Sequence, residues 1–348
     1  MKIIQLEEVK LNGVGPASLK KLVEGGVTTI NAIAMMTEYD LVELTGLGPE
    51  TALSAIDQAR IHIGAGFISG VELAERLGDE ETHTTGSTIL DEALGGGIHI
   101  GVISEFSGEF GALKTQLCMT ASVICAATKG TVIVLDTEGT WGGDGIVRLK
   151  QIAESRGYDP DVVLSKFLVA RAFNSEHMGL LIKQLPSLVN EHKAKMVVVD
   201  SIISHFRSED QWQGRGKLAN RQQTLGGVVG RLLKVAEGFG VSMLFTNQVQ
   251  ANVEGGWGPK FKPAGGHVLG HACTYRFMLF KGKQVSGGKF DGGGEGKDYQ
   301  TSILHILDTS SLPPSKTRVM CTEAGIVNAD GTYPEQVKEE ILDETVDS

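Results

Sequence analysis

The sequence predicts an α/β protein whose core has a mostly parallel central sheet, preceded by a small all-α domain. From Thr85 onward, apolar strand-like runs alternate with amphipathic helical stretches, and the runs are nearly continuous in Val, Ile and Leu. Such strands are typical of a parallel sheet that helices cover on both faces. A repeated Gly-x-Gly-Pro pattern within residues 1–62 predicts the small helical domain.

The composition narrows the class of protein. A chain of 348 residues that is 41% hydrophobic can bury a large core and is expected to hold more than one domain. Its four cysteines show no C-x-x-C spacing, which favours a reduced, cytoplasmic protein. No apolar run approaches the ~20 residues that span a bilayer, and no signal peptide is expected. A net charge of −10 argues against indiscriminate binding of polyanions.

The helical domain, residues 1–62, contains two similar segments. Residues 11–16 precede a helical pattern at 17–23, and residues 44–49 precede a second one at 50–61. Each segment resembles the helix-hairpin-helix motif, whose tight glycine turn exposes backbone N–H groups at a helix N-terminus, where a DNA phosphate can bind without base readout. The alternative is a pair of packing units that bind no ligand. Two matches in tandem favour contact with DNA.

A linker is expected at 63–82, followed by the core at 83–334 and an acidic tail at 335–348. Phe67 and Gly70 lie in this linker. A phenylalanine there either packs on its own domain or docks on another surface, and from the residues alone local packing is favoured.

The core is organised around a glycine-bearing turn between a predicted strand at 102–106 and a predicted helix at 115–128. This context indicates a P-loop, whose backbone N–H groups face a polyphosphate. Lys114 would reach the β- and γ-phosphates, and the Thr115 hydroxyl would bind Mg²⁺. The motif is G-x-x-x-x-G-K-T, and its second glycine is here Leu113. The predicted nucleotide-binding stretch is Gly108, Glu109, Phe110, Gly111, Ala112, Leu113, Lys114, Thr115 and Gln116.

Two acidic strand ends accompany this loop. Asp200 ends an apolar run in a Walker B pattern that would hold Mg²⁺. Glu138 follows the neighbouring strand and could act as general base on the attacking water. A single acid of this kind is often a helix cap, but three such features at the carboxyl ends of parallel strands favour a nucleotide site.

These motifs resemble those of archaeal RadA recombinases, a branch of the RecA family of DNA strand-exchange ATPases. The resemblance covers nearly the whole chain. Besides the paired helix-hairpin-helix repeats, it rests on residues 84–87, 94–98, 108–111, 136–140, 169–174, 205–207, 214–216, 221–223, 246–250 and 265–271.

The resemblance implies an ATP-dependent homologous recombinase with a RecA-like P-loop core. Such a protein forms filaments on single-stranded DNA and catalyses homologous pairing and strand exchange in DNA repair. ATP and Mg²⁺ are the implied cofactors, with K⁺ as a further candidate. The implied partners are single- and double-stranded DNA, copies of the protein in a helical filament or ring, and recombination mediators at the nucleoid.

The resemblance also assigns roles to individual residues. Lys114, Glu138, Gln248 and His271 are the implied catalytic residues; the last two would sense the γ-phosphate and relay it to the DNA-binding loops. Thr115 and Asp200 are the implied ligands of Mg²⁺. Asp308 and Pro313 are implied to cap the ATP of an adjacent subunit. Phe67 and Gly70 are implied to form the polymerisation contact. The resemblance implies that Phe67 inserts into a neighbouring subunit, whereas the residues alone favour packing of Phe67 on its own domain.

Two DNA-binding loops are expected at 207–217 and 250–264. Both are polar and Gly-rich, and their cations can neutralise phosphates despite the negative total charge. Trp212 and Trp257 lie in them, and could either stack on bases or pack on their own domain. The candidates for DNA binding are Arg207, Arg215, Lys217, Arg221, Val253, Trp257 and Lys260.

The chain departs from the family pattern in two places that concern the nucleotide. Leu113 could crowd the phosphate or force the turn into another path. The run Trp141-Gly142-Gly143-Asp144-Gly145 stands where the family has an aromatic-Arg-Pro-Glu-Arg run, so both arginines are expected to be missing. The first loop also appears about two residues longer than usual. The alternative function is therefore a weakly nucleotide-binding or non-hydrolysing recombinase paralogue or mediator that acts as a filament component.

Overall fold

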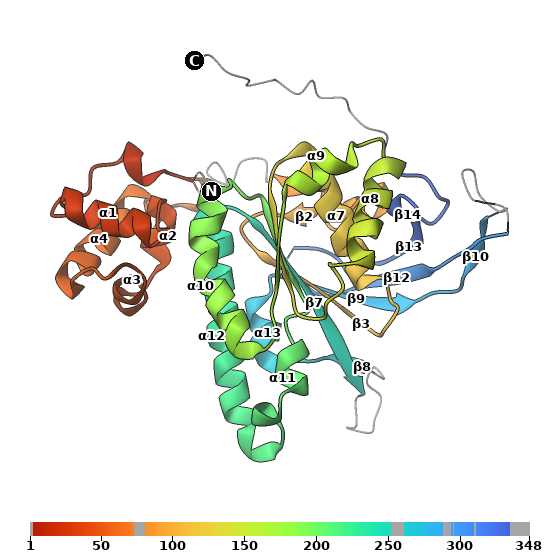
Figure 1. Cartoon of the computed structure of the whole chain (residues 1–348). Coiled ribbons are helices and arrows are strands. Elements are labelled where there is room, and N and C mark those ends of the chain that lie inside the picture. Colours follow the sequence, from red (N-terminus) through yellow and green to blue (C-terminus); the bar gives the residue numbers. More distant parts are fainter. Residues whose placement is uncertain are drawn as a thin grey trace, which may run out of the picture.

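A small helical domain lies beside a larger α/β core in the computed structural model, which describes residues 3–72, 81–251, 261–287, 294, 296–309 and 311–334 (Figure 1). Gly15 and Gly48 are the N-caps of α1 and α4, and a proline follows each. Proline is favoured at the first helical position because its missing N–H would have no partner there. The elements of this domain are η1 (Leu6–Glu8), α1 (Pro16–Glu24), α2 (Ile30–Met35), α3 (Glu38–Thr45) and α4 (Pro49–His62).

The core is built on a ten-stranded sheet with the order β14-β13-β12-β9-β3-β7-β6-β4-β5, in which β8 pairs with β7. The strands from β9 to β5 in this order are parallel, as predicted. The strands are β3 (Ile103–Gly108), β4 (Val132–Asp136), β5 (Phe167–Arg171), β6 (Met196–Asp200), β7 (Ser242–Ala251), β8 (Phe261–Pro263), β9 (Tyr275–Lys281), β12 (Thr301–Asp308), β13 (Lys316–Thr322) and β14 (Gly325–Asn328).

Two details of the sheet differ from the prediction. The sequence of the region from Tyr275 to Val319, with its Gly-rich turns, predicts antiparallel strands at the sheet edge. In the structure β9 runs parallel to β3, and only its other edge, against β12, is antiparallel. The second predicted loop is also shorter, because β7 continues to Ala251 and pairs with β8. Two separate small sheets are formed by β1 (Thr82–His83) with β2 (Ile98–His99), and by β10 (Val285–Ser286) with β11 (Asp298–Tyr299).

Helices cover both faces of the sheet (Figure 1). One core cluster joins the sheet to α7 and α8, and the other joins it to α10 and α12. Cys118 and Cys125 lie seven positions apart on α7, a spacing that predicts one shared helix face, and both are buried in the first cluster. The helices are α6 (Thr88–Ala93), α7 (Lys114–Thr128), α8 (Asp144–Ser155), α9 (Pro160–Ser165), α10 (Ser175–Glu191), α11 (Ser204–Ser208), η2 (Asp210–Trp212), η3 (Arg215–Lys217), α12 (Leu218–Phe239) and α13 (Gly266–Ala272).

The helical domain docks on the C-terminal end of α12. The Thr29 hydroxyl donates to the Gly238 carbonyl at 2.8 Å, and a Cβ on Gly238 would lie only 2.9 Å from the Ala32 Cα. Glycine at 238 therefore permits this close approach. Two ion pairs flank the contact: Lys183–Glu43, with Nζ and Oε1 2.8 Å apart, and Lys234–Asp40.

Within the described ranges, no helix combines the length and the hydropathy that crossing a membrane requires.

Candidate nucleotide and DNA site

The phosphate loop joins the end of β3 to the start of α7. Leu113 is the N-cap of α7 and has φ 68° and ψ 16°, in the left-handed region that favours glycine. A leucine in this conformation costs roughly 1–2 kcal/mol relative to the right-handed region. Its side chain is partly buried and packs on the core cluster beneath α7. Leucine thus leaves the turn in a glycine-like conformation and does not divert it into another path.

Replacing Leu113 by glycine is expected to change the affinity for a non-hydrolysable ATP analogue by less than about threefold, because the backbone already has the glycine-like conformation. The free energy of unfolding should also change little. Relief of about 1–2 kcal/mol of strain is offset by lost burial and by the greater freedom of glycine in the unfolded chain. Isothermal titration and thermal unfolding measure the two quantities.

Leu113→Val is the matched control, since a β-branched residue fits the left-handed region worse than leucine does. It should lower the midpoint of thermal unfolding. If Leu113→Gly instead tightens nucleotide binding tenfold or more, the leucine side chain obstructs the phosphate and the conclusion drawn from its backbone is wrong.

Lys114 follows at the first position of α7. Its ammonium donates to the carbonyls of Gly108, at 3.0 Å, and Glu109, at 2.8 Å, and so lies across the mouth of the loop. Burial lowers the pKa of Lys114, while the nearby carboxylates of Glu138 and Asp200 act in the opposite direction. A cation in this position faces the space where phosphate oxygens would lie.

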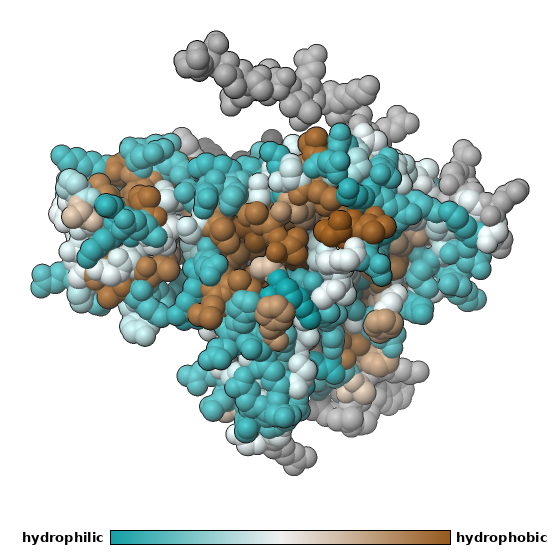
Figure 2. Space-filling model, viewed as in Figure 1, coloured by the Kyte–Doolittle hydropathy of each residue, from teal (hydrophilic) through white to brown (hydrophobic). Residues whose placement is uncertain are grey.

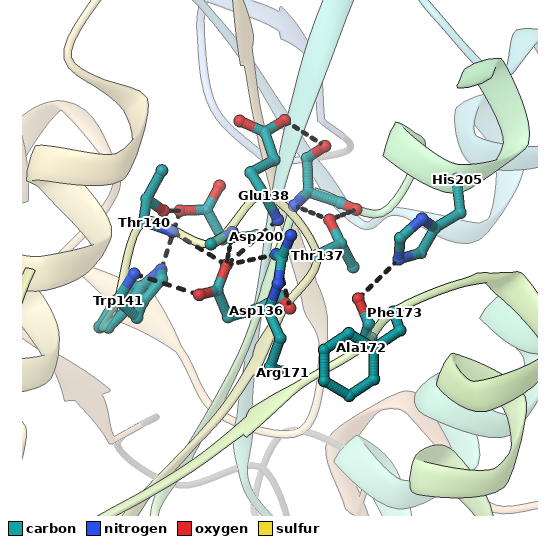
Figure 3. A network of polar contacts seen from close by, with 12 residues as sticks. Asp136, Thr137, Glu138, Thr140, Trp141, Arg171, Ala172, Phe173, Asp200 and His205 are labelled. Carbon is teal, nitrogen blue, oxygen red and sulfur yellow. Dashed lines mark hydrogen bonds and ion pairs between the residues drawn. The ribbon is translucent and has the colours of Figure 1, made fainter. Parts of the chain in front are cut away.

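Asp200 ends β6 and lines the same cleft as Thr115. The carboxylate is almost fully buried and accepts from the Thr246 hydroxyl and, at 2.9 Å, from Trp141 Nε1 (Figure 3). Burial raises the pKa of Asp200, and the hydrogen bonds oppose that effect. A hydroxyl and a carboxylate are the oxygen ligands that Mg²⁺ uses beside nucleotide phosphates, so these residues fit that ion.

Glu138 lies at the end of β4, on the other side of the same space (Figure 3). Its Oε1 accepts from the Ser201 hydroxyl at 2.8 Å and from Gln248 Nε2 at 2.9 Å. The amide oxygen of Gln248 in turn accepts from Arg207 at 2.9 Å. A continuous chain of hydrogen bonds therefore connects the start of the first predicted DNA loop with the candidate general base.

These groups line one cleft of about 600 Å³, which is large enough for a nucleotide. Every residue of the predicted phosphate loop except Ala112, whose side chain is buried, lines it. The lining residues are Gly108, Glu109, Phe110, Gly111, Leu113, Lys114, Thr115, Gln116, Glu138, Thr140, Asp200, Arg207, Gln248, Val249 and Phe261.

Comparisons with known proteins agree with this architecture. A family model described as Rad51 matches residues 81–329, and a model of a SAM-like helix-hairpin-helix tandem matches residues 6–60. The chain is 37% identical over 322 residues to the DNA repair and recombination protein RadA of Aeropyrum pernix, a match that covers 91% of this chain and 95% of that protein. The chain belongs to the Rad51 family.

Membership of the Rad51 family confirms the fold class and the recombinase function that the motifs predicted. Proteins of this family are DNA-dependent ATPases of recombination and repair, which bind DNA and form oligomeric filaments. The chain accordingly uses a nucleotide together with a divalent metal ion.

His271, Asp308 and Pro313 do not line the cleft of this single chain, although the family resemblance implies roles for them at the nucleotide. His271 is exposed near the end of α13, where its ring stacks on His267 with centroids 5.8 Å apart. Asp308 ends β12, and Pro313 lies in the segment between β12 and β13.

Sequence reasoning missed one arginine near the cleft. Residues 142 and 145 are indeed glycines, but Arg148 on the first turns of α8 donates from Nε to Gln116 Oε1 at 2.8 Å, and Gln116 lines the cleft. Its guanidinium is also held by the Thr322 carbonyl, at 2.5 Å. The signal available in the sequence was the spacing of residues 145 and 148, which are three positions apart and therefore lie on the same face of a helix.

The first predicted DNA loop contains short helices and is braced against α10. Glu209 accepts from the Ser175 backbone N–H at 2.5 Å and from Trp212 Nε1 at 3.0 Å. The Trp212 ring packs on Phe206 with centroids 5.6 Å apart. These contacts favour local packing of Trp212 over stacking on bases.

Lys217 and Arg207 are exposed around this loop, and Arg221 is partly exposed on the first turn of α12. The side chain of Arg215 and the whole of Val253, Trp257 and Lys260 lie outside the described structure, as does the predicted tail at 335–348.

Proposed function

We propose that this protein is an ATP-dependent recombinase that polymerises on single-stranded DNA, pairs it with homologous double-stranded DNA and exchanges strands. The observation that carries the proposal is the convergence of Lys114, Thr115, Asp200 and Glu138 on one cleft, linked by Gln248 to a DNA loop. Because chromosomal DNA would be its substrate, we place its work in the cytoplasm at the nucleoid, in contact with recombination mediators.

The phosphate loop and Lys114 would bind the β- and γ-phosphates of ATP, and Thr115 and Asp200 would hold Mg²⁺. When bound, Mg²⁺ neutralises the charge that develops on the phosphate oxygens. Within the described residues Glu138 Oε2 has no hydrogen-bond partner, so it can accept a proton from the attacking water while Oε1 stays fixed. The water oxygen bonds to the γ-phosphorus, and ADP leaves.

Arg148 would form the part of the nucleotide site that lies against the base. It is anchored on α8, and its contact with Gln116 fixes the residue that follows the Mg²⁺-binding threonine. A guanidinium held flat by several acceptors can stack against a planar ring. His271, Asp308 and Pro313 would reach the nucleotide of a neighbouring protomer or act only in the assembled filament.

Phe67 and Gly70 would form the polymerisation contact. Phe67 is fully exposed in its own chain, so it makes no local core contact. In a second copy, Phe67 would dock on an apolar surface. Figure 2 shows apolar side chains gathered between α10 and the pair α8 and α9. This region includes β5, the last strand of the sheet, whose edge is open to pair with a segment from a second copy. The exposed apolar residues of α9, β5, α10 and the segment between β5 and α10 are Val162, Val169, Leu180 and Phe173.

DNA would contact the protein at two places. The cations at the start of α12 and in the two loops would neutralise phosphates: Arg207, Arg215, Lys217, Arg221 and Lys260, with Val253 and Trp257 beside the bases. In the helical domain, the N-termini of α1 and α4 follow Gly15 and Gly48 and would each bind a phosphate through backbone N–H groups.

The alternative, a non-hydrolysing filament component or mediator, is distinguished by measuring phosphate release with and without single-stranded DNA. The recombinase should hydrolyse ATP faster when DNA is present and should exchange strands between homologous substrates. DNA binding without any stimulated turnover would instead support the mediator. The glycine-like conformation of Leu113 favours the recombinase, because it leaves the phosphate loop intact.

A further inference from the structure

Trp141 contacts both acidic strand ends of the nucleotide site. Its indole is completely buried, and Nε1 donates to Asp200 Oδ2 at 2.9 Å (Figure 3). Its backbone N–H donates to Asp136 Oδ2 at 3.2 Å. One residue thus connects the carboxylate that would hold the metal with the carboxylate that ends the neighbouring strand.

The direction of the indole is fixed by the turn that precedes it. Asp136 Oδ1 accepts from the backbone N–H groups of Glu138 at 3.1 Å, Gly139 at 2.6 Å and Thr140 at 3.2 Å. A carboxylate bonded to three successive N–H groups holds the backbone in one conformation. The indole ring packs within the core cluster beneath α7 and α8. Because this packing fixes the orientation of the ring, the indole N–H group can point in only one direction.

Asp200 consequently has few lone pairs left. Oδ1 accepts from the Thr246 hydroxyl, and Oδ2 accepts from Trp141 Nε1 and, at 3.4 Å, from the Thr140 hydroxyl. An ionised carboxylate offers about four lone-pair sites in total. The Trp141 bond occupies the oxygen that Asp200 would otherwise need to bind a cation through both oxygens at once.

We propose that Trp141 is a positioning residue that limits Asp200 to a one-oxygen or water-mediated contact with the cation, and thereby makes the site selective for Mg²⁺ over Ca²⁺. This inference rests on the proposed nucleotide–metal function of the cleft. Ca²⁺ takes six to eight oxygens and often binds carboxylates through both oxygens, whereas Mg²⁺ retains several waters in an octahedral shell. Restricting Asp200 therefore penalises Ca²⁺ more than Mg²⁺.

Trp141→Phe tests the proposal, because it keeps an aromatic ring and removes only the N–H donor and one ring. The dissociation constants of Mg²⁺ and Ca²⁺ would be measured by competition with Mn²⁺, detected by electron paramagnetic resonance, on the full chain saturated with a non-hydrolysable ATP analogue. The preference for Mg²⁺ over Ca²⁺ should fall by about fivefold or more, roughly 1 kcal/mol. Trp212→Phe, which removes an indole braced against α10, should keep the wild-type preference.

The outcomes separate this inference from the function on which it rests. An unchanged preference in a folded Trp141→Phe protein overturns the inference alone. Failure of the wild-type chain to bind metal with the nucleotide overturns both.

If Trp141→Phe does not fold, a spectroscopic measurement decides. In a chain carrying Trp212→Phe and Trp257→Phe, the ultraviolet resonance Raman band of the remaining buried indole should have the frequency of a hydrogen-bonded N–H. The frequency of an unbonded indole would overturn the proposal.

Discussion

Lys114→Ala is expected to lower DNA-stimulated ATP turnover by about 10²–10³-fold, equivalent to roughly 3–4 kcal/mol of lost transition-state stabilisation. The ammonium is the cation that lies across the phosphate loop, within 3.0 Å of the Gly108 carbonyl. Without it, the charge that develops on the transferred phosphoryl group has no matching partner from the loop. Release of inorganic phosphate in the presence of single-stranded DNA measures the effect.

A lysine at the opposite end of the same helix provides the control. Lys129 is the exposed C-cap of α7, and Lys129→Ala should keep the wild-type rate. Thermal unfolding must show that the Lys114→Ala protein is folded, since its ammonium also joins two loop carbonyls. Turnover within about threefold of wild type in that folded protein would show that the cleft is not the site of hydrolysis.

Phe67→Glu should break filaments into short oligomers. Loss of a buried phenylalanine contact is worth roughly 3 kcal/mol, and a carboxylate placed in an apolar pocket adds a desolvation cost. An association constant reduced by more than about a hundredfold shortens the polymer, because each protomer adds through the same contact. Light scattering with DNA and nucleotide measures the mean mass.

A second exposed apolar residue controls for the added charge. Ile61 is 76% exposed on α4, and Ile61→Glu should leave the polymer length unchanged. Val169→Glu on the open edge of β5 should act like Phe67→Glu, because it places the charge on the receiving surface. Filaments of wild-type length from Phe67→Glu would remove this residue from the interface.

Much of the core could be predicted because its signals are local. The run before Asp200 is apolar at four successive positions, which few structures other than a doubly covered parallel strand accommodate. The amphipathic patterns at 175–191 and 218–239 predict two long helices. Their bounds agree with those of α10 and α12 in the structure because each pattern is long. Parallel pairing then brings Asp200 beside Asp136 at one edge of the sheet.

The parts that could not be predicted depend on contacts between distant residues. Leucine disfavours the left-handed conformation of residue 113, and only the surrounding fold holds it there. Trp212 is anchored by Ser175, 37 positions earlier, so the loop sequence alone left stacking and packing open. Arg148 lies three positions beyond the glycine-rich run at 142–145, and its contact with Gln116 depends on the helix that follows that run.

The length of α12 has a consequence for the footprint on DNA. This helix begins at the first DNA loop and ends where Gly238 supports the helical domain, so it separates the two proposed DNA contacts. Its 22 residues, at about 1.5 Å each, span roughly 33 Å. Phosphates of one strand of a B-form duplex are spaced by about 3.4 Å along the axis. The loop and the docking point of the helical domain would therefore be separated by about the span of ten phosphates, so the helical domain would contact a different stretch of DNA, or a second duplex, from the one held by the loop.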